Sequence, residues 1–441
     1  MISPEDFADR YAASLLRDIG WHGAPIQHAR EHPAISWVSS GLMDITGHAN
    51  GPALMCPVPI TAAADGALLA LATLANAPPL QNIRGATLLG QRARLMKLQR
   101  QGRISPGGAS RLMQACDGWF ALTLARPEDW ASIPAFLNGA PCGSWNAIES
   151  AVRSMPIKRL LQRAHLLGLP ASRADKSAVA KAWFQTTAVP GKLAAKQSRP
   201  VVIDLSTLWA GPLCGQLLHR AGAFVVKVES THRRDGARSG HDGFFDFLNA
   251  GKASAAFDFR RSAETEALRR MIERADIVIE SARPRALRQL GLAAESLVAE
   301  NPGLTWVSIT GHGRHAPHED RVGFGDDAAA AAGLCHAMQT AHGDMVFCGD
   351  AIADPLTGLH AALAAWASWQ TGGGMVSLSL SGVTAYCVAQ GASSNPAQRV
   401  DEWSRHVRRR PQALALPTAP APARHLGADT HAVLSDFAIA C

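Results

Sequence analysis

The sequence predicts an α/β protein whose parallel sheet is covered by helices on both faces and is joined to a smaller α+β domain. The main observation is a β-branched apolar run at 201–205, followed by a helical pattern at 213–221 and a second apolar run at 224–228. Further strand-like runs alternate with helical segments as far as residue 380. By contrast, residues 85–181 mix basic helical segments with a short strand-like run.

The segment 201–228 places a strand, a turn, a helix and a second strand within about 30 residues. This arrangement is the βαβ unit of a Rossmann-like, nucleotide-binding sheet. The helical segments 263–275 and 287–300 separate later strands, as crossover connections between parallel strands do. Four more strands are expected in this half of the chain, at 254–257, 277–279, 305–309 and 375–380.

Composition and pattern divide the chain into five segments. The first contains an amphipathic helical pattern at 1–21 and an apolar, alanine-rich helical run at 60–75. The second segment has a basic helical pattern at 91–103, a strand-like run at 120–124 and a further helical pattern at 128–167. The five segments are a partial copy of a later part of the chain (1–84), a small α+β domain (85–181), a linker (182–199), the Rossmann-like domain (200–395) and a C-terminal tail (396–441). We expect the tail to be a surface strap or a mobile segment.

The bulk composition is that of an ordinary soluble globular protein, with 47% hydrophobic and 18% charged residues. The net charge of +7 suits an anionic partner, but basic and aromatic residues do not interleave, so we expect no nucleic-acid partner. The run 60–75 contains Asp65 and is too short to span a bilayer, and residues 1–21 lack the pattern of a signal peptide. We therefore expect a cytoplasmic protein with no membrane partner.

The eight cysteines are scattered and form no C-x-x-C pair, which argues against a zinc or redox motif and fits a reducing compartment. His312, His315 and His318 are evenly spaced, but Gly313 and Pro317 break any shared helical face. We therefore predict no metal site and no permanently bound cofactor.

An internal repeat relates residues 41–72 to residues 333–364 without a gap, at a constant offset of 292 positions. Matching residues include Gly41 and Gly333, as well as Cys56 and Cys348. The copies differ chemically at one position, where Asp354 of the later copy corresponds to Ala62 of the earlier one. Residues 1–84 are therefore interpreted as a partial, degenerate copy of the segment around Asp354.

Several segments in order carry a family resemblance: VIDLSTLWAGPLCGQLLHRAGAFVVKVES (202–230), ADIVIESARPRALRQLGL (275–292) and AIADPLTGLHAALAAW (351–366). They resemble the class III coenzyme A transferases of the CaiB/BaiF type, a family that includes formyl-CoA transferases and α-methylacyl-CoA racemases. The resemblance extends over 199–390. Segments before residue 182 are similar to the later half of the family, so the order of segments is rearranged relative to that family.

The resemblance implies transfer of CoA between an acyl-CoA thioester and a carboxylic acid, with CoA as a co-substrate. It implies that Asp354 is the nucleophile, which forms first an acyl anhydride and then an aspartyl-CoA thioester. It also implies a homodimer. The implied CoA-binding residues are Leu208, Trp209 and Ala210 in the turn after the first strand, Ser281, and, as phosphate contacts, Arg234, Lys252, Arg283 and Arg285.

Acidic residues at predicted helix starts have a second interpretation. Asp354 followed by Pro355 fits an N-cap with proline at the first helical position. Asp326 and Asp327 likewise fit a pair at a helix entry.

Two alternative functions remain open at this point. Racemases of this family pair the aspartate with a histidine about 30 residues upstream, where this chain has Phe324, and phenylalanine cannot move a proton. This favours a transferase over an acyl-CoA racemase or isomerase. A non-catalytic CoA-binding relative is the second alternative, because Ala62 replaces the aspartate in the first copy and Trp209 stands where transferases often carry a polar side chain.

Overall fold

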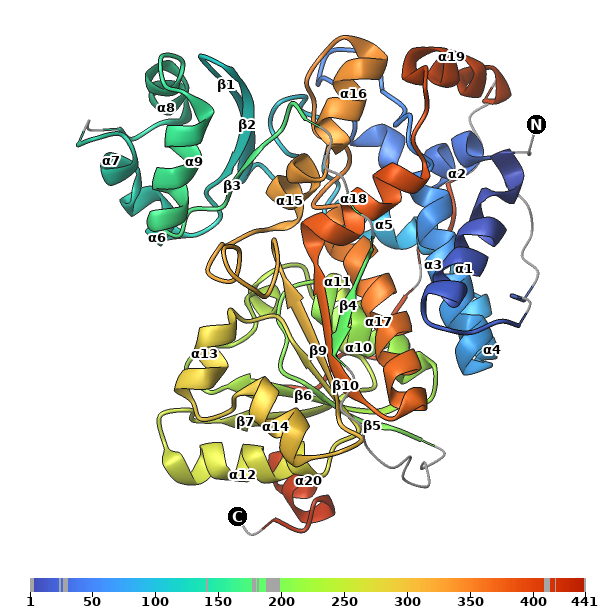
Figure 1. The fold of residues 1–441 in the computed structure, drawn as a ribbon, viewed down its shortest axis with the longest axis vertical. Helices are drawn as coiled ribbons and strands as arrows, with labels where there is room; N and C mark the ends of the chain where they lie inside the picture. The colour runs from blue at the N-terminus through green and yellow to red at the C-terminus, as the bar shows by residue number, and fades with distance from the viewer. Residues whose placement is uncertain are drawn as a thin grey trace.

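In the computed structural model, a large sheet, a group of helices and a small antiparallel-sheet domain lie against one another (Figure 1). The large sheet occupies the lower part of the view, and the small domain lies at the upper left. The predicted mixed α/β architecture is confirmed. The structure describes residues 4–23, 25–26, 31–139, 142–176, 180, 182–187, 199–407, 413–416 and 418–439.

Within the described residues, the large sheet has seven strands in the order β4-β10-β9-β8-β5-β6-β7. Neighbouring strands are parallel except for β4 and β10, which pair antiparallel. All six predicted strands of this half are present, and β4 is an addition within the predicted linker. The strands are β4 (Gln185–Thr187), β5 (Val201–Asp204), β6 (Phe224–Ser230), β7 (Ala253–Phe257), β8 (Ile277–Glu280), β9 (Thr305–Thr310) and β10 (Gly374–Ser379).

Numbered along the chain, the strands β5 to β10 have the order of a doubly wound nucleotide-binding sheet. The direction of winding changes between β5 and β8, which lie side by side. In such sheets, ligands bind in the crevice outside the carboxyl ends of the strands at this switch point. The fold therefore points to the loops that follow β5 and β8.

Helices cover both faces of the sheet. Successive residues of a strand point to opposite faces, and the strands are apolar on both, so each face must be covered. Val202 and Ile277 belong to the core shared with α10, α17 and α18. Their chain neighbours Ile203 and Val278 belong to the core shared with α12, α13 and α14. The helices of this half are α10 (Ala210–Arg220), α11 (Asp242–Asn249), α12 (Ser262–Glu273), α13 (Pro284–Gln289), α14 (Ala294–Glu300), α15 (Gly325–Ala331), α16 (Leu334–His342), α17 (Ala353–Thr371) and α18 (Leu380–Gln390), with a short 3-10 helix η3 (Gly236–Ser239).

One predicted helix is interrupted and another ends earlier than expected. The pattern at 287–300 is split between α13 and α14, because Gly291 adopts a left-handed conformation with φ of 75°. The basic pattern at 91–103 is helical only to Leu95, and Lys97 has a positive φ of 54°. Left-handed residues end a helix because the next backbone N–H groups turn away from its axis.

The N-terminal helices pack on α10, α17 and α18 and share one core with them. The predicted buried helix at 60–75 is confirmed as α3, whose residue Gly66 lets α1 approach closely: a Cβ there would be 2.6 Å from Ala8 O. These elements are η1 (Pro4–Asp6), α1 (Phe7–Asp18), α2 (Pro33–Ser39), η2 (Leu42–Asp44), α3 (Ile60–Ala75), α4 (Pro78–Gln81) and α5 (Gly85–Leu95).

The small domain has a three-stranded antiparallel sheet and a separate core around Phe120 and Phe136. It contacts α15 through β2 and β3. Its elements are β1 (Ser110–Ala115), β2 (Gly118–Thr123), α6 (Pro127–Ala131), α7 (Ile133–Phe136), α8 (Trp145–Val152), α9 (Ile157–Leu166) and β3 (Ala171–Arg173).

The C-terminal tail contains two helices, α19 (Pro396–His406) and α20 (Thr430–Asp436), which the sequence analysis did not predict. Between them, Leu414 N–H donates to Ser39 O at 2.9 Å, and Asp429 N–H donates to Ser254 O at 2.8 Å. The tail thus runs from the N-terminal helices back to β7, as a strap would. Among the described residues, no helix combines the length and apolar character needed to cross a bilayer.

Candidate active site

Asp354 lies in the first turn of α17, a helix that is buried on most of its surface. The helix begins at Ala353 with Ile352 at the N-cap, so the interpretation of Asp354 as the N-cap is wrong. Its carboxylate lies against the start of α15, where a Cβ on Gly325 would be 2.2 Å from Asp354 Oδ2. Only glycine at this position leaves room for the carboxylate.

A buried ion pair beside Asp354 joins the two halves of the chain. Asp350 is fully buried, and the guanidinium of Arg92, from α5, donates to both of its oxygens at 2.7 and 2.6 Å. The same guanidinium lies over the ring of Trp209, 5.4 Å from its centroid. Burial by itself would lower the pKa of Arg92, but the nearby carboxylates, first that of Asp350, hold the pKa above its ordinary value. Arg92 therefore supplies a permanent positive charge to an acidic cluster.

Asp326 is a second buried carboxylate of this cluster. It accepts hydrogen bonds from Ser110 Oγ at 2.9 Å and from Ala351 N–H at 2.8 Å. Burial, followed by the charge of Asp350, raises the pKa of Asp326 to about 6. Asp327 differs, because its carboxylate accepts the Phe324 N–H at 2.7 Å and so serves the start of α15. The predicted helix-entry role thus holds for Asp327, whereas Asp326 belongs to the acidic cluster.

The surroundings of Asp354 raise the pKa of its carboxyl to about 7. Burial is the largest cause. Arg92 acts in the opposite direction, and the charges of Asp326 and Asp350 raise the pKa further. The residue is nevertheless partly exposed. A carboxyl group that titrates near neutral pH is suited to act as a nucleophile or as an acid–base group.

The turn after β5 and the loop after β8 meet at the switch point of the sheet. Thr207 N–H donates to Ser281 Oγ at 3.0 Å, and Leu208 N–H donates to Asp235 Oδ1 at 2.9 Å. Leu208 is 41% exposed and has a left-handed φ of 70°, which is unusual for a leucine and is imposed by these anchors. Two predicted CoA-binding residues, Leu208 and Ser281, are thus brought together.

Trp209 and Ala210 face the interior. Trp209 is 4% exposed and packs edge-on against Phe244 in addition to its contact with Arg92. The carbonyl oxygen of Ala210 lies against α17 about one turn beyond Asp354, where a Cβ on Gly358 would be 2.7 Å from it. The turn and the nucleophile helix are therefore in direct contact, but little of the Trp209 side chain is left for CoA to touch.

Lys252 is buried, and this corrects its predicted role. Its ammonium group donates to Asp204 Oδ2 and to Pro212 O at 2.8 Å each, and to Asn249 Oδ1 at 3.2 Å, and its side chain is 1% exposed. A direct phosphate contact does not fit this placement. Lys252 instead ties α10 to β5, and loss of its charge would leave Asp204 buried and unpaired, at a cost of about 3–5 kcal/mol.

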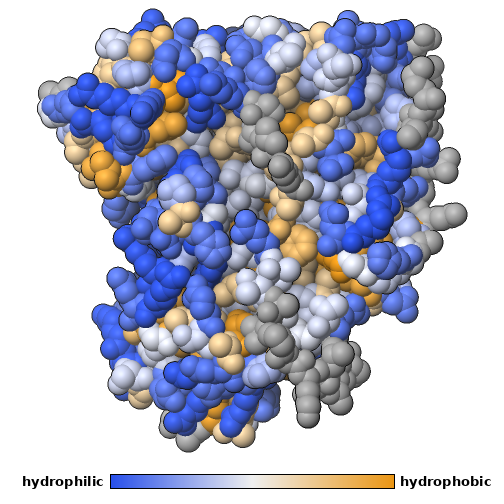
Figure 2. All heavy atoms as spheres, in the orientation of Figure 1, coloured by the Kyte–Doolittle hydropathy of each residue, from blue (hydrophilic) through white to orange (hydrophobic). Residues whose placement is uncertain are grey.

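Arginine side chains gather on the surface beside the switch point. Arg283 and Arg285 are exposed at the start of α13, over which the surface in Figure 2 is hydrophilic. Burial, followed by the positive charges of Arg285 and Arg126, lowers the pKa of Arg283. Arg234 is exposed after β6. A group of guanidinium groups that repel one another is suited to bind phosphate, and Arg126, from the small domain, was not predicted.

The histidines after β9 have ordinary partners. His312 Nε2 lies 3.2 Å from Asp327 Oδ2, and both side chains are buried. Within the part of the chain that the structure describes, no group of three or more histidine, cysteine or acidic side chains has the geometry to hold a metal ion.

The model of CoA-transferase family III matches residues 200–419. This segment belongs to CoA-transferase family III. It includes Asp354, the turn after β5 and the arginines of α13. The family III assignment confirms the resemblance inferred from the sequence.

Relatives and solved structures match the chain in part. An acyl-CoA transferase of Fusarium pseudograminearum is 33% identical over 36% of this chain and 38% of its own length. The succinyl-CoA–D-citramalate CoA-transferase of Chloroflexus aurantiacus is 35% identical over 30% of this chain and 35% of its own. The crystal structure of a CaiB/BaiF family protein from Brucella suis is 31% identical, with a TM-score of 0.40 over 43% of this chain and 54% of that chain. The chain thus spans about two-fifths of the length of the curated relatives it matches.

The structure gathers Asp354, the turn of Leu208 to Ala210 and Ser281 around the switch point, and it separates Lys252 from them. Sequence reasoning missed Asp350 and Arg92. No local motif marks Arg92, because its partner is 258 positions away. The repeat contained one signal for Asp350. Asp350 corresponds to an apolar residue of the first copy, Val58, just as Asp354 corresponds to Ala62.

Proposed function

We propose that this protein transfers CoA between an acyl-CoA thioester and a carboxylic acid through Asp354. The observation that carries the proposal is the carboxyl of Asp354, with a pKa of about 7, in a partly exposed residue at the start of α17 and inside the family III segment. The neighbouring switch-point loops and the arginines of α13 supply a binding surface of the right charge for CoA.

The reaction has two symmetrical halves. The Asp354 carboxylate attacks the thioester carbonyl, the C–S bond breaks, and an acyl-aspartyl anhydride and CoA thiolate form. The thiolate then attacks the aspartyl carbonyl, which releases the acyl group as its carboxylate and leaves an aspartyl-CoA thioester. The acceptor carboxylate attacks this thioester and regenerates CoA thiolate, which takes the new acyl group from the second anhydride and frees Asp354.

The surroundings of Asp354 serve this chemistry in two ways. The first turn of α17 presents the positive end of the helix dipole, which favours the ionised carboxylate and the oxyanions that form on it. Arg92 acts in the same direction, while the ion pair with Asp350 fixes its guanidinium in place. The raised pKa also makes Asp354 more nucleophilic once ionised than an ordinary surface aspartate.

The decisive experiment measures exchange of labelled CoA between acyl-CoAs and free acids, with succinyl-CoA included because several relatives are named for it. We expect exchange with wild-type protein and with Asp436→Asn, an exposed aspartate of α20. We expect none with Asp354→Ala or Asp354→Asn. Hydroxylamine should trap an adduct on Asp354 of the wild-type protein, detected by mass spectrometry of the peptide.

The alternatives give different results in the same experiment. A racemase would wash out the α-proton of the acyl-CoA without exchanging CoA. A non-catalytic CoA-binding protein would bind CoA by calorimetry but show neither exchange nor an adduct. Either result would overturn the proposed transfer.

A further inference from the structure

Helices of the two repeat copies correspond well beyond the repeat seen in the sequence. The helix α2 begins and ends 292 positions before α15, and α3 and α17 begin within one residue of the same offset. Gly90 in α5 and Gly382 in α18 are also 292 positions apart. The N-terminal helices therefore have a counterpart, in the same order, in the family III segment.

The helix α1 has α10 as its counterpart. A Cβ on Gly66 of α3 would be 2.6 Å from Ala8 O, and a Cβ on Gly358 of α17 would be 2.7 Å from Ala210 O. The two glycines are 292 positions apart, so α1 lies on α3 as α10 lies on α17. Phe7, which precedes Ala8, then takes the place of Trp209.

The two sets of helices pack against each other, with α3 lying on its counterpart α17. The side chains of Cys56 and Cys348, which correspond in the repeat, are in hydrogen-bond contact with each other. Contact between equivalent residues is what a two-fold axis passing between them produces. One chain thus contains two related versions of the arrangement around Asp354.

A pocket of about 660 Å³ lies beside the second version. Three of its lining residues are the counterparts of residues around Asp354: Phe7 corresponds to Trp209, Pro33 to Gly325 and Pro59 to Ala351. The acids of the candidate active site are absent from the first copy. Ala34, Ile35, Val58 and Ala62 correspond to Asp326, Asp327, Asp350 and Asp354.

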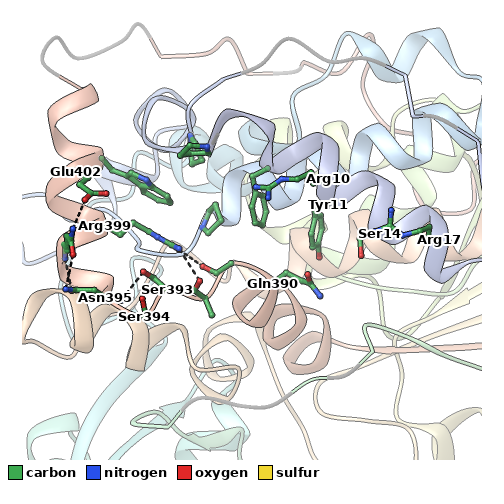
Figure 3. A pocket seen from close by; sticks show the side chains of 18 residues that line it. Arg10, Tyr11, Ser14, Arg17, Gln390, Ser393, Ser394, Asn395, Arg399 and Glu402 are labelled. Atoms are coloured by element: carbon green, nitrogen blue, oxygen red, sulfur yellow. Dashed lines mark hydrogen bonds between the residues drawn. The ribbon is translucent and has the colours of Figure 1, made fainter. Parts of the chain in front are cut away.

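The lining of this pocket is cationic. Arg10, Ser14 and Arg17 lie along one face of α1, and Arg399 of α19 lies on the opposite side (Figure 3). Arg399 donates to the carbonyl oxygens of residues 57, 391 and 392, so hydrogen bonds fix its position without cancelling its charge. The acid in the lining, Glu402, accepts from Gln398 Nε2 at 2.9 Å.

Aromatic rings give the pocket an apolar part. Phe7, Tyr11 and Trp403 line it together with the arginines, and the guanidinium of Arg10 lies 6.0 Å from the centroid of the Phe7 ring. No strand occurs among the described residues before Ser110, so the first copy supplies no switch-point crevice for a nucleotide. The ligand that fits is a small acid with an apolar body.

We infer that this pocket is a second, non-catalytic site that binds an organic carboxylate of medium chain length. The positive charge of the arginines along α1 attracts the carboxylate, and the aromatic rings receive the alkyl or aryl body. Without a counterpart of Asp354, the site holds the acid without activating it.

Isothermal titration calorimetry with octanoate tests this inference, with octanamide as the uncharged probe. We expect saturable binding of octanoate and at least tenfold weaker binding of octanamide. Arg10→Gln/Arg17→Gln should weaken octanoate binding at least tenfold. Arg153→Gln/Arg159→Gln removes the same charge from exposed positions of the small domain and should change binding less than twofold.

Absence of saturable octanoate binding would overturn the inference, as would equal binding by the two double variants. Thermal unfolding of both variants shows whether Arg10→Gln/Arg17→Gln is folded, which we expect because both arginines are exposed. The Asp354→Asn protein should bind octanoate at this site as the wild type does. Wild-type protein that binds octanoate but exchanges no CoA would contradict the proposed transfer alone, and wild-type protein that exchanges CoA but binds no octanoate would contradict this inference alone.

Discussion

At the scale of single residues, one guanidinium faces three aspartates. Arg92 pairs directly with Asp350 and acts at a distance on Asp326 and Asp354. One positive charge cannot offset three clustered negative charges, so protons are retained near neutral pH. The pKa values of about 6 and 7 for Asp326 and Asp354 express this balance.

The raised pKa of Asp354 predicts a pH dependence of both activity and stability. Transfer requires the ionised carboxylate, so kcat/KM should fall about tenfold per pH unit below about 7. Because the folded pKa exceeds the unfolded one, the wild type takes up a proton on folding between about pH 4 and 7 and loses stability as pH rises through this window.

Asp354→Asn should remove this loss of stability. For an isolated buried group, a pKa shift of this size would change the free energy of unfolding by about 4 kcal/mol. Asp354 is partly exposed and shares its surroundings with Asp326, so we expect a change of about 1–2 kcal/mol in the free energy of unfolding. Urea unfolding should show the variant more stable than wild type at pH 8 and equal to it at pH 4. Asp436→Asn is the control, and an equal difference at both pH values would contradict the assigned pKa.

The pair of Arg92 and Asp350 should be strongly coupled. Arg92→Gln leaves Asp350 buried without a partner and should cost about 3–5 kcal/mol of unfolding free energy. Arg92→Gln/Asp350→Asn should recover at least half of this loss. A double-mutant cycle by urea unfolding measures the coupling, and additive losses would show that the pair is not formed as described.

At the scale of elements, the site depends on how closely α15 approaches α17. Gly325 is in contact with both the Asp354 carboxylate and the main chain of Ala351, where a Cβ would be 2.4 Å from the carbonyl oxygen. Backbone atoms cannot give way as a flexible side chain can. The contact therefore fixes the carboxylate through two helices rather than through one side chain.

Gly325→Ala should displace Asp354 and lower stability. We expect a loss of about 1–3 kcal/mol from overpacking and at least a tenfold fall in the rate of CoA exchange. Gly143→Ala is the matched control, since nothing lies within 4 Å of a Cβ there and its φ is not left-handed. Rapid-mixing assays and thermal unfolding measure the two effects, and unchanged exchange would mean that α15 does not position the nucleophile.

At the scale of the whole molecule, one hydrophobic core joins residues from α1 to α19. The faces of α17 and α18 that meet α3 are apolar and would be exposed without the N-terminal helices. Burial of each leucine-sized side chain is worth about 1.5–3 kcal/mol, so the loss of many such contacts exceeds the stability of a typical domain.

Residues 199–441 expressed alone should therefore not fold cooperatively. We expect binding of a hydrophobic dye and no sharp thermal transition, in contrast to the full chain. Co-expression with residues 1–187 should restore a cooperative transition. A fragment that unfolds cooperatively by itself would show that the family III segment forms its own core. The homodimer implied by the family resemblance stays a prediction, which sedimentation of the full chain measures.

The sequence by itself determined the strands of the parallel sheet and the helix at 60–75, because these depend on local patterns of apolar residues, and the family resemblance pointed to Asp354. It also revealed the repeat. Only the tertiary structure decided that Lys252 is buried and that Arg92 and Asp350 form a pair beside Asp354. The charge state of Asp354 likewise depends on groups from α5, α15 and the loop before α17, and contacts between residues so far apart in the chain leave no local pattern to read.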